Sequence, residues 1–298
     1  MRQEHIYIAM EFLHAHMGYS IKEMCVVLKL NRASYYKWKK RKQSKSELLN
    51  IQITGYIKEF YEESDGVLGY RQMCITLNRE KAEELPHSVN VKRIRRLMRI
   101  LGLKSVIRRK RPGYIKSTPE VTAENVLNRD FKATVPFEKW LSDVTEFKYY
   151  IGPEAKKLYL SAILDLYDRR IIAYKLGDSN NNALVFETFD EARNLYPNAK
   201  PIFHSDRGFQ NTSKTFRPKL VDAGMIQSMS RVGRCLDNAP MEGWWGILKS
   251  EMYYLRRFTS RETLVSAIEN YIRFYNTRRY QKRLNCMTPY EYYFSTAA

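Results

Sequence analysis

The amino-acid sequence predicts an α/β fold, a mixed sheet with helices on its faces, preceded by an all-helical region. Within residues 136–235, three runs with strand character follow one another and then alternate with helical segments, which is typical of such a sheet. Residues 4–102 show helical periodicity only. The charge changes as well: residues 1–135 carry 27 Lys and Arg against 14 Asp and Glu, whereas residues 136–298 carry 24 against 18.

The composition favours a protein that binds nucleic acid. A formal charge of +19 makes a polyanion the natural partner, with solubility or nonspecific adhesion as the alternative. At 298 residues and 44% hydrophobic content the chain can bury a core, and no apolar run is long enough to predict a membrane span. The start at Met1 does not resemble a signal peptide. The four cysteines form no Cys-x-x-Cys pair, which indicates reduced thiols in a cytoplasm rather than a zinc ribbon or a disulfide framework.

The first helical segments are expected at residues 4–17, 21–28 and 32–42. Ser20 and Asn31 are suitable N-cap residues for the second and third. Two short helices across a tight turn, of which the second is polar, aromatic and basic, match a helix-turn-helix. An ordinary helical bundle is the alternative for this pattern.

A second helical block is expected at residues 48–62, 70–81 and 91–102. The last helix has one apolar stripe, and Gly102 suits the position after its end. Its other surface is cationic, with the candidate DNA-binding residues Lys92, Arg93, Arg95, Arg96 and Arg99. Eleven basic residues and no acidic one lie between Lys92 and Lys116, whereas a merely solvated helix intersperses both signs.

A basic segment without periodicity follows this block. Arg108, Arg109, Lys110 and Arg111 precede Pro112-Gly113, which indicates a linker that follows a phosphate backbone or enters a minor groove.

The remaining elements alternate between strands and helices. Strands are expected at residues 140–150, 158–167, 170–176, 202–205 and 226–230, and helices at 182–196, 212–224, 240–254 and 262–280. The last helix is expected to pack on the core, with contact to DNA or to a second subunit as the alternative.

Three acidic residues stand in positions that aim them at a common point. Asp143 lies in a strand, Asp206 directly follows one, and Glu242 lies in the first turns of a helix, with 35 residues between Asp206 and Glu242. Clustered carboxylates repel one another unless a cation lies between them, and Mg²⁺ prefers oxygen ligands. A pair of such ions roughly 4 Å apart is suited to in-line displacement at a phosphate.

Each of these acids also has a structural interpretation, as a turn, strand-end or helix-start residue. Asp165 is expected to be structural, and His204 is expected to support the site rather than bind metal. A tyrosine recombinase is the rival chemistry, but its Arg-His-Arg-Tyr arrangement is not visible around Arg278-Arg279-Tyr280.

The order of motifs resembles the integrase core of bacterial insertion-sequence transposases, in particular the second-reading-frame protein of the IS-three family. The motifs are Trp140 to Glu146, Leu160 to Asp165, His204-Ser205-Asp206-Arg207-Gly208, Ser228-Met229-Ser230, Asp237-Asn238-Ala239-x-x-Glu242 and Phe274-Tyr275-Asn276-x-x-Arg279. The sequence departs from the family's usual choices at Asn211, Val232-Gly233-Arg234 and Gly243-Trp244-Trp245.

The resemblance implies an RNase H-like catalytic core in which Asp143, Asp206 and Glu242 are the catalytic, metal-binding carboxylates. It implies Mg²⁺ as the cofactor, two ions with Mn²⁺ as a substitute, and a DNA contact by Lys249, which shares a helix face with Glu242. The activity would be cleavage and transfer of DNA strands at insertion-sequence ends. A catalytically inactive DNA-binding regulator of transposition is the alternative.

The resemblance also implies partners and a domain order. The partners are double-stranded DNA (element ends and target), a second or further copies of the chain, and an upstream first-frame protein, in a bacterial cytoplasm at the nucleoid. The expected domains are a helix-turn-helix at 1–45, a second helical DNA-binding domain with basic linker at 46–116, a linker at 117–135, the core at 136–255 and a helical extension at 256–298.

Overall fold

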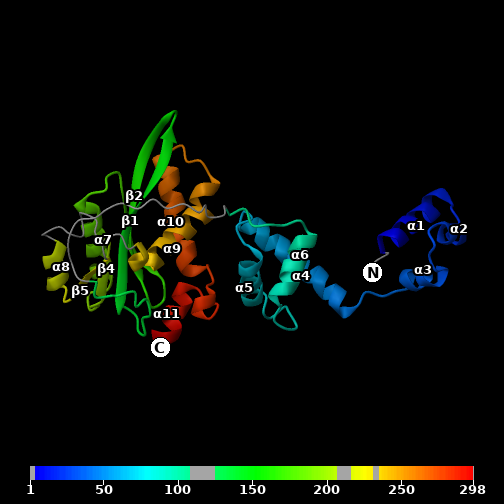
Figure 1. Ribbon diagram of the computed structural model, residues 1–298, viewed down its shortest axis with the longest axis horizontal. Coiled ribbons are helices and arrows are strands. Elements are labelled where there is room, and N and C mark those ends of the chain that lie inside the picture. The colour runs from blue at the N-terminus through cyan, green and yellow to red at the C-terminus, as the bar shows by residue number, and fades with distance from the viewer. Residues whose placement is uncertain (1–3, 108–124, 207–215, 231–234, 298) are drawn as a thin grey trace. The chain divides into compact units, whose positions relative to one another are not determined.

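The computed structural model describes residues 4–107, 125–206, 216–230 and 235–297 (Figure 1). The chain divides into two compact units, Met1–Lys58 and Glu59–Ala298. No helix among the described residues is long and apolar enough to cross a membrane.

The first unit contains three short helices around a small core. They are α1 (Glu4–Met17), α2 (Ile21–Val27) and α3 (Arg32–Lys39). The core consists of the buried residues Tyr7, Met10, Ile21, Cys25 and Tyr35. Asn31 caps α3 as expected, because its side chain accepts a hydrogen bond from the Ala33 amide at 2.8 Å. Ser20 stands at the N-cap of α2 but makes no side-chain capping bond. A long helix, α4 (Lys45–Glu63), follows.

The second unit begins with the end of α4 and two further helices, α5 (Tyr70–Glu80) and α6 (Val91–Ile100). The apolar stripe of α6 is buried through Ile94, Leu97 and Met98, as its periodicity predicts. Gly102 ends this segment with a φ of +71°, a conformation that favours glycine.

The rest of the second unit is built on one five-stranded sheet in the order β3-β2-β1-β4-β5. The strands are β1 (Lys139–Ile151), β2 (Glu154–Asp165), β3 (Ile171–Gly177), β4 (Ile202–Ser205) and β5 (Ile226–Met229). The β1–β2 and β2–β3 pairs are antiparallel, whereas β1–β4 and β4–β5 are parallel. The predicted mixed sheet is therefore confirmed, with β1 at its centre.

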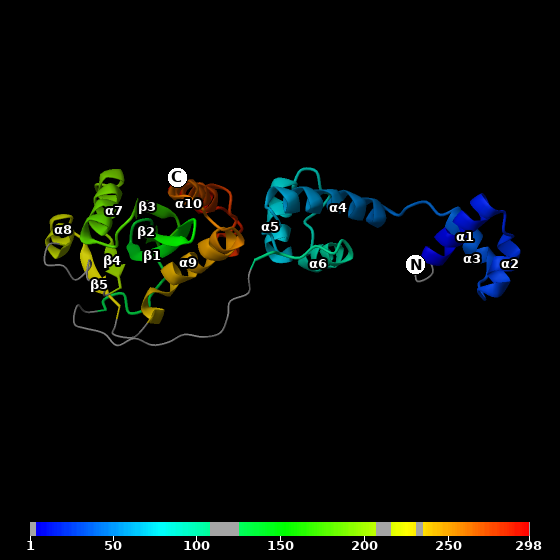
Figure 2. The same ribbon diagram turned by 90° about the horizontal axis from the view of Figure 1, so that it is seen from above.

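Helices cover both faces of this sheet (Figure 2). On one face, α7 (Asn182–Leu195) and α8 (Phe216–Asp222) pack on a core that includes Trp140, Ile163 and Phe203. On the other face, α9 (Ala239–Glu251) and α10 (Arg261–Thr277) pack on a core that includes Leu141 and Leu160. Since neighbouring residues of β1 face opposite sides, Asp143 shares the α9 face with Leu141.

The structure corrects several predicted ends. The second strand was expected to run to Tyr167 but ends at Asp165, whose Oδ1 accepts a hydrogen bond from the Tyr167 amide at 2.7 Å and so forms a turn. The helix predicted to reach Tyr280 ends at Thr277. The first part of the helix predicted at 212–224 lies outside the described residues, and α8 accounts for the remainder.

Short elements complete the chain. They are the 3₁₀ turns η1 (Cys235–Asn238), η2 (Tyr253–Leu255) and η3 (Lys282–Leu284), and the final helix α11 (Pro289–Ala297). The helix α11 was not predicted from the sequence, although Thr288 and Glu291 form a reciprocal capping box. This pair, with proline between them at the start of the helix, is the signal that would have located it.

Candidate active site

Two of the predicted carboxylates lie side by side where the parallel pairing of β1 with β4 ends. Ser142 of β1 pairs with Ser205 of β4, so Asp143 and Asp206 each follow one member of that pair. Both acids are half-buried. The strand order therefore brings together residues that are 63 positions apart in the sequence.

The helix α9 supplies the third acid and packs against β1. Trp245 donates a hydrogen bond from Nε1 to Oδ2 of Asp143 at 2.9 Å, and Asn238 donates one from Nδ2 to the Ser142 carbonyl at 3.3 Å. Glu242 is exposed and precedes Trp245 by three residues, which places both on one side of α9. The role of Trp245 as a partner of Asp143 was not identified from the sequence.

The carboxylate of Asp143 feels the charge of both other acids. Burial raises the pKa of Asp143 to about 7, to which the negative charges of Asp206 and then Glu242 contribute. Hydrogen bonds from Trp245 and the Val144 amide act in the opposite direction. Among the described residues, no three acidic, histidine or cysteine side chains are grouped closely enough to hold a metal ion. The acids thus share an electrostatic environment without forming a closed cage.

A buried polar layer supports the strand ends beneath the acids. His204 is fully buried, and its ring nitrogens lie 2.9 Å from Oγ of Ser228 and 3.1 Å from Oγ of Ser230 on the β5 side. Burial lowers the pKa of His204 to about 4, so the ring is neutral near pH 7. Because both nitrogens have hydroxyl partners, this histidine has a supporting position.

Asp237 ties the start of α9 to the segment that leads into the sheet. It is fully buried and accepts hydrogen bonds from Asn125 Nδ2 at 2.8 Å and Arg129 Nε at 2.6 Å. In the sequence, Asp237 stands out only as part of a motif. Its local context gives no indication of partners more than 100 positions away.

Asp165 has the structural role that was expected of it. Its side chain accepts hydrogen bonds from the Phe137 amide at 2.8 Å and from Trp140 Nε1 at 3.2 Å, in addition to the Tyr167 amide. Burial raises the pKa of Asp165 to about 7. With these donors around it, Asp165 closes the turn after β2.

The predicted DNA-binding residues occupy several places. On α6, Lys92, Arg95, Arg96 and Arg99 are exposed, and Arg93 is half-buried. Lys249 lies on α9 with Nζ 5.1 Å from the centre of the Phe147 ring, and burial lowers its pKa. Arg108, Arg109, Lys110 and Arg111 lie outside the described residues.

The chain matches two known kinds of protein domain. Sequence profiles of the integrase core domain match residues 133–235 and 242–295, and a profile of an HTH-like domain matches residues 49–111. The sheet that carries Asp143 and Asp206 is therefore part of an integrase core domain.

Relatives that match most of the chain show its family. The chain is 38% identical over 275 residues to the InsK protein of insertion sequence element IS150 from Escherichia coli, covering 92% of this chain and 93% of the relative. It is 30% identical over 255 residues to the transposase of IS904 from Lactococcus lactis, with coverages of 85% and 97%. The chain belongs to the IS-three family of insertion-sequence transposases.

A solved structure shows a more distant likeness. The catalytic core domain of the HTLV-2 integrase, in complex with magnesium, is 18% identical, covers 54% of this chain and 99% of its own, and has a TM-score of 0.43.

Proposed function

We propose that Asp143, Asp206 and Glu242 are the catalytic carboxylates of this transposase and that they hold divalent metal ions during cleavage and transfer of DNA strands at insertion-sequence ends. The observation that carries this proposal is the pairing of Ser142 with Ser205, which puts Asp143 and Asp206 side by side. Glu242 faces them from α9, close enough to raise the pKa of Asp143.

The three side chains fit a hard divalent cation by their chemistry. All offer carboxylate oxygens, the donors that Mg²⁺ prefers, and their mutual repulsion is relieved by positive charge. Two Mg²⁺ ions, or Mn²⁺ in their place, would polarise the attacking oxygen and stabilise the departing 3′-oxygen. Asp143 is held for this role by Trp245, whose hydrogen bond fixes Oδ2.

The reaction is phosphoryl transfer without a covalent enzyme intermediate. When water attacks the phosphorus, the bond to the 3′-oxygen breaks and a free 3′-hydroxyl is left, which is strand cleavage. When that 3′-hydroxyl attacks a second phosphodiester, one strand is joined and another is released, which is strand transfer. The residues of this chain that face the reacting phosphate are the three carboxylates and, on the same side of α9, Lys249.

The proposed partners follow from this reaction. Element ends and target are double-stranded DNA, contacted by the cationic face of α6, by Lys249 and by the segment 108–111. A dimer or larger assembly brings two ends together, and an upstream first-frame protein adds end recognition. The proposed place of action is the bacterial cytoplasm.

Metal removal tests the proposed chemistry directly. With a duplex that carries the element's end, EDTA is expected to abolish cleavage, and excess Mg²⁺ or Mn²⁺ is expected to restore it. The same ions should raise the midpoint of thermal unfolding, because a ligand that binds only the folded state adds stability, about 2.7 kcal/mol at a hundredfold excess over Kd. Cleavage in EDTA, or no cleavage and no thermal shift with either ion, would contradict the proposal.

Charge reversal on α6 tests the docking role of that helix. The double variant Arg95→Glu, Arg96→Glu is expected to bind DNA more weakly and with a shallower salt dependence. The slope of log K against log salt concentration becomes less negative by about 0.9 for each phosphate that the protein no longer neutralises.

A matched control separates this effect from net charge. Arg193 of α7 and Arg217 of α8 are exposed on the sheet face opposite α9, and reversing both gives the same change in charge. If the α6 variant and this control show equal slopes, α6 does not dock DNA.

A further inference from the structure

A cavity lies on the opposite side of α9 from the carboxylates. Pro240, Gly243 and Ile247 line a cavity of about 500 Å³, whereas Glu242 and Lys249 lie about half a helical turn away from that row. A Cβ added at Gly243 would meet no atom within 4 Å, so the cavity is open at this position.

The charge of this cavity is of one sign. No Asp or Glu among the described residues lines it. Its charged lining residues are all basic: Arg71, Arg169, Arg279, Lys282 and Arg283. Arg279 is paired with Glu251, at 2.6 and 2.9 Å. The other four form no ion pair with any described residue.

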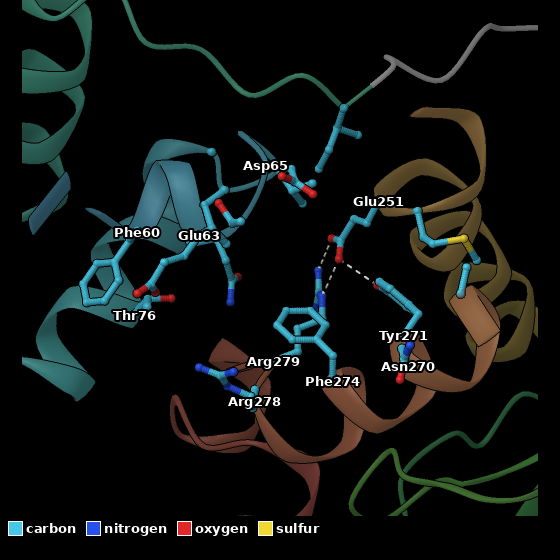
Figure 3. A pocket seen from close by; sticks show the side chains of 18 of the residues that line it. Phe60, Glu63, Asp65, Thr76, Glu251, Asn270, Tyr271, Phe274, Arg278 and Arg279 are labelled. Atoms are coloured by element: carbon cyan, nitrogen blue, oxygen red, sulfur yellow. Dashed lines mark hydrogen bonds and ion pairs between the residues drawn. The ribbon is translucent and has the colours of Figure 1, made fainter. Parts of the chain in front are cut away.

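The neighbouring cavity of about 630 Å³ provides a contrast (Figure 3). Its lining combines basic with acidic side chains, namely Arg256, Arg278 and Arg279 with Glu63, Asp65, Glu80 and Glu251. Figure 3 shows Glu251 between Arg279 and Tyr271, whose hydroxyl donates to it at 2.7 Å. Positive charge is therefore balanced there but not in the cavity beside α9.

Some residues that line the all-basic cavity also contain buried donors. They include Nη1 of Arg169 and Nε1 of Trp244, which have no hydrogen-bond partner among the described residues. Trp244 is 2% exposed, so its N–H group is removed from bulk solvent. Burial and then the charge of Arg283 lower the pKa of Arg169 to about 10, whereas the charges of Asp165 and Asp168 act in the opposite direction.

The start of α9 also favours an anion in this cavity. Ala239 and Pro240, its first two residues, line the cavity, and the N-cap Asn238 makes no side-chain capping bond. The positive end of a helix of this length attracts anions.

We propose that this cavity binds the sugar-phosphate backbone of DNA, at a site separated from the catalytic carboxylates by the thickness of α9. The inference rests on the proposed function, since it assigns a further contact to the same substrate. Cationic side chains without an ion-pair partner suit phosphate oxygens, which carry charge but no sequence information. A DNA strand held there would fix the duplex on both sides of the helix that bears Glu242.

The test compares two exposed cations of the all-basic cavity with one exposed cation that lies outside it. Lys282 and Arg283 are exposed and line the all-basic cavity, whereas Arg278 is exposed and lines only the mixed cavity. Binding of the full chain to duplexes of unrelated sequence is measured in EDTA over a range of salt concentrations. In a plot of log K against log salt concentration, the double variant Lys282→Gln, Arg283→Gln should give a slope that is less negative by about 0.9 for each phosphate that it no longer neutralises. The effect should be the same on every duplex. Arg278→Gln should leave the slope unchanged.

The outcomes separate this inference from the catalytic proposal. A double variant with the slope of the unmodified protein or of Arg278→Gln would overturn the phosphate site. Because the binding is measured without metal, a failure of the carboxylate mechanism would leave the difference between the variants intact. Circular dichroism confirms that each variant is folded.

Discussion

Replacing Asp206 by Asn is expected to reduce strand cleavage by about three orders of magnitude or more while DNA binding is retained. The amide has the size of the carboxylate but lacks its charge, so the site loses a metal ligand without a change in packing. Losses of this size are characteristic of removing one member of a catalytic group that acts as a unit. The measurement is the single-turnover rate of cleavage with Mg²⁺, alongside the Kd for the same duplex.

Asp178 offers the same chemical change away from the site. It is paired with Arg261, and its side chain is 62% exposed. Asp178→Asn is expected to cleave at the rate of the unmodified protein. Full activity in Asp206→Asn would refute the assignment of the carboxylates, and equal losses in both variants would indicate a general effect on the fold.

Truncation of Arg170 is expected to cost about 3–5 kcal/mol of the free energy of unfolding, because it leaves a buried carboxylate without its partner. Arg170 is 2% exposed, and its Nε donates to Oδ2 of the fully buried Asp168 at 2.9 Å. Its guanidinium also lies 3.6 Å from the centre of the Tyr293 ring, so it fastens α11 to the sheet. Denaturant unfolding of Arg170→Ala measures the loss.

An exposed ion pair provides the comparison. Arg261 is 38% exposed and pairs with Asp178 at 2.7 Å, and Arg261→Ala is expected to cost no more than about 1 kcal/mol. Replacing both members of the buried pair, as in Asp168→Leu with Arg170→Met, should recover part of the stability, since no unpaired charge remains. Equal losses for Arg170→Ala and Arg261→Ala would contradict the importance given to burial.

The sheet could be predicted from the sequence because each of its elements has a recognisable local pattern of apolar residues. Runs such as Ile202 to Ser205 are apolar enough to be read as buried strands, and the order of strands and helices agrees with the structure. The three acids could be selected because Asp143 lies in such a strand, Asp206 directly follows one and Glu242 lies in the first turns of a helix. Burial of Ile94 and Leu97 on α6 likewise followed from periodicity alone.

The contacts around the acids could not be predicted in the same way. The hydrogen bond between Trp245 and Asp143 depends on how α9 rotates against β1, which no local pattern specifies. The cavity beside α9 assembles Arg71, Arg169 and Arg283 from three distant segments. In the sequence, Arg169 is simply a polar residue in a turn. Its surroundings arise only when the tail and the sheet are folded together.

Because Ser142 pairs with Ser205, the positions of Asp143 and Asp206 depend on the number of residues that precede them in their strands. Side chains alternate between the faces of a sheet, so one residue inserted or deleted between Lys139 and Asp143 would turn that carboxylate towards α7, on the far side. Conservative changes of side chain within this stretch preserve the count, and a frame-preserving loss of a single codon does not. Damaged copies of such an element can therefore encode a chain of nearly unchanged composition whose chemistry has been silenced by one missing step in a strand.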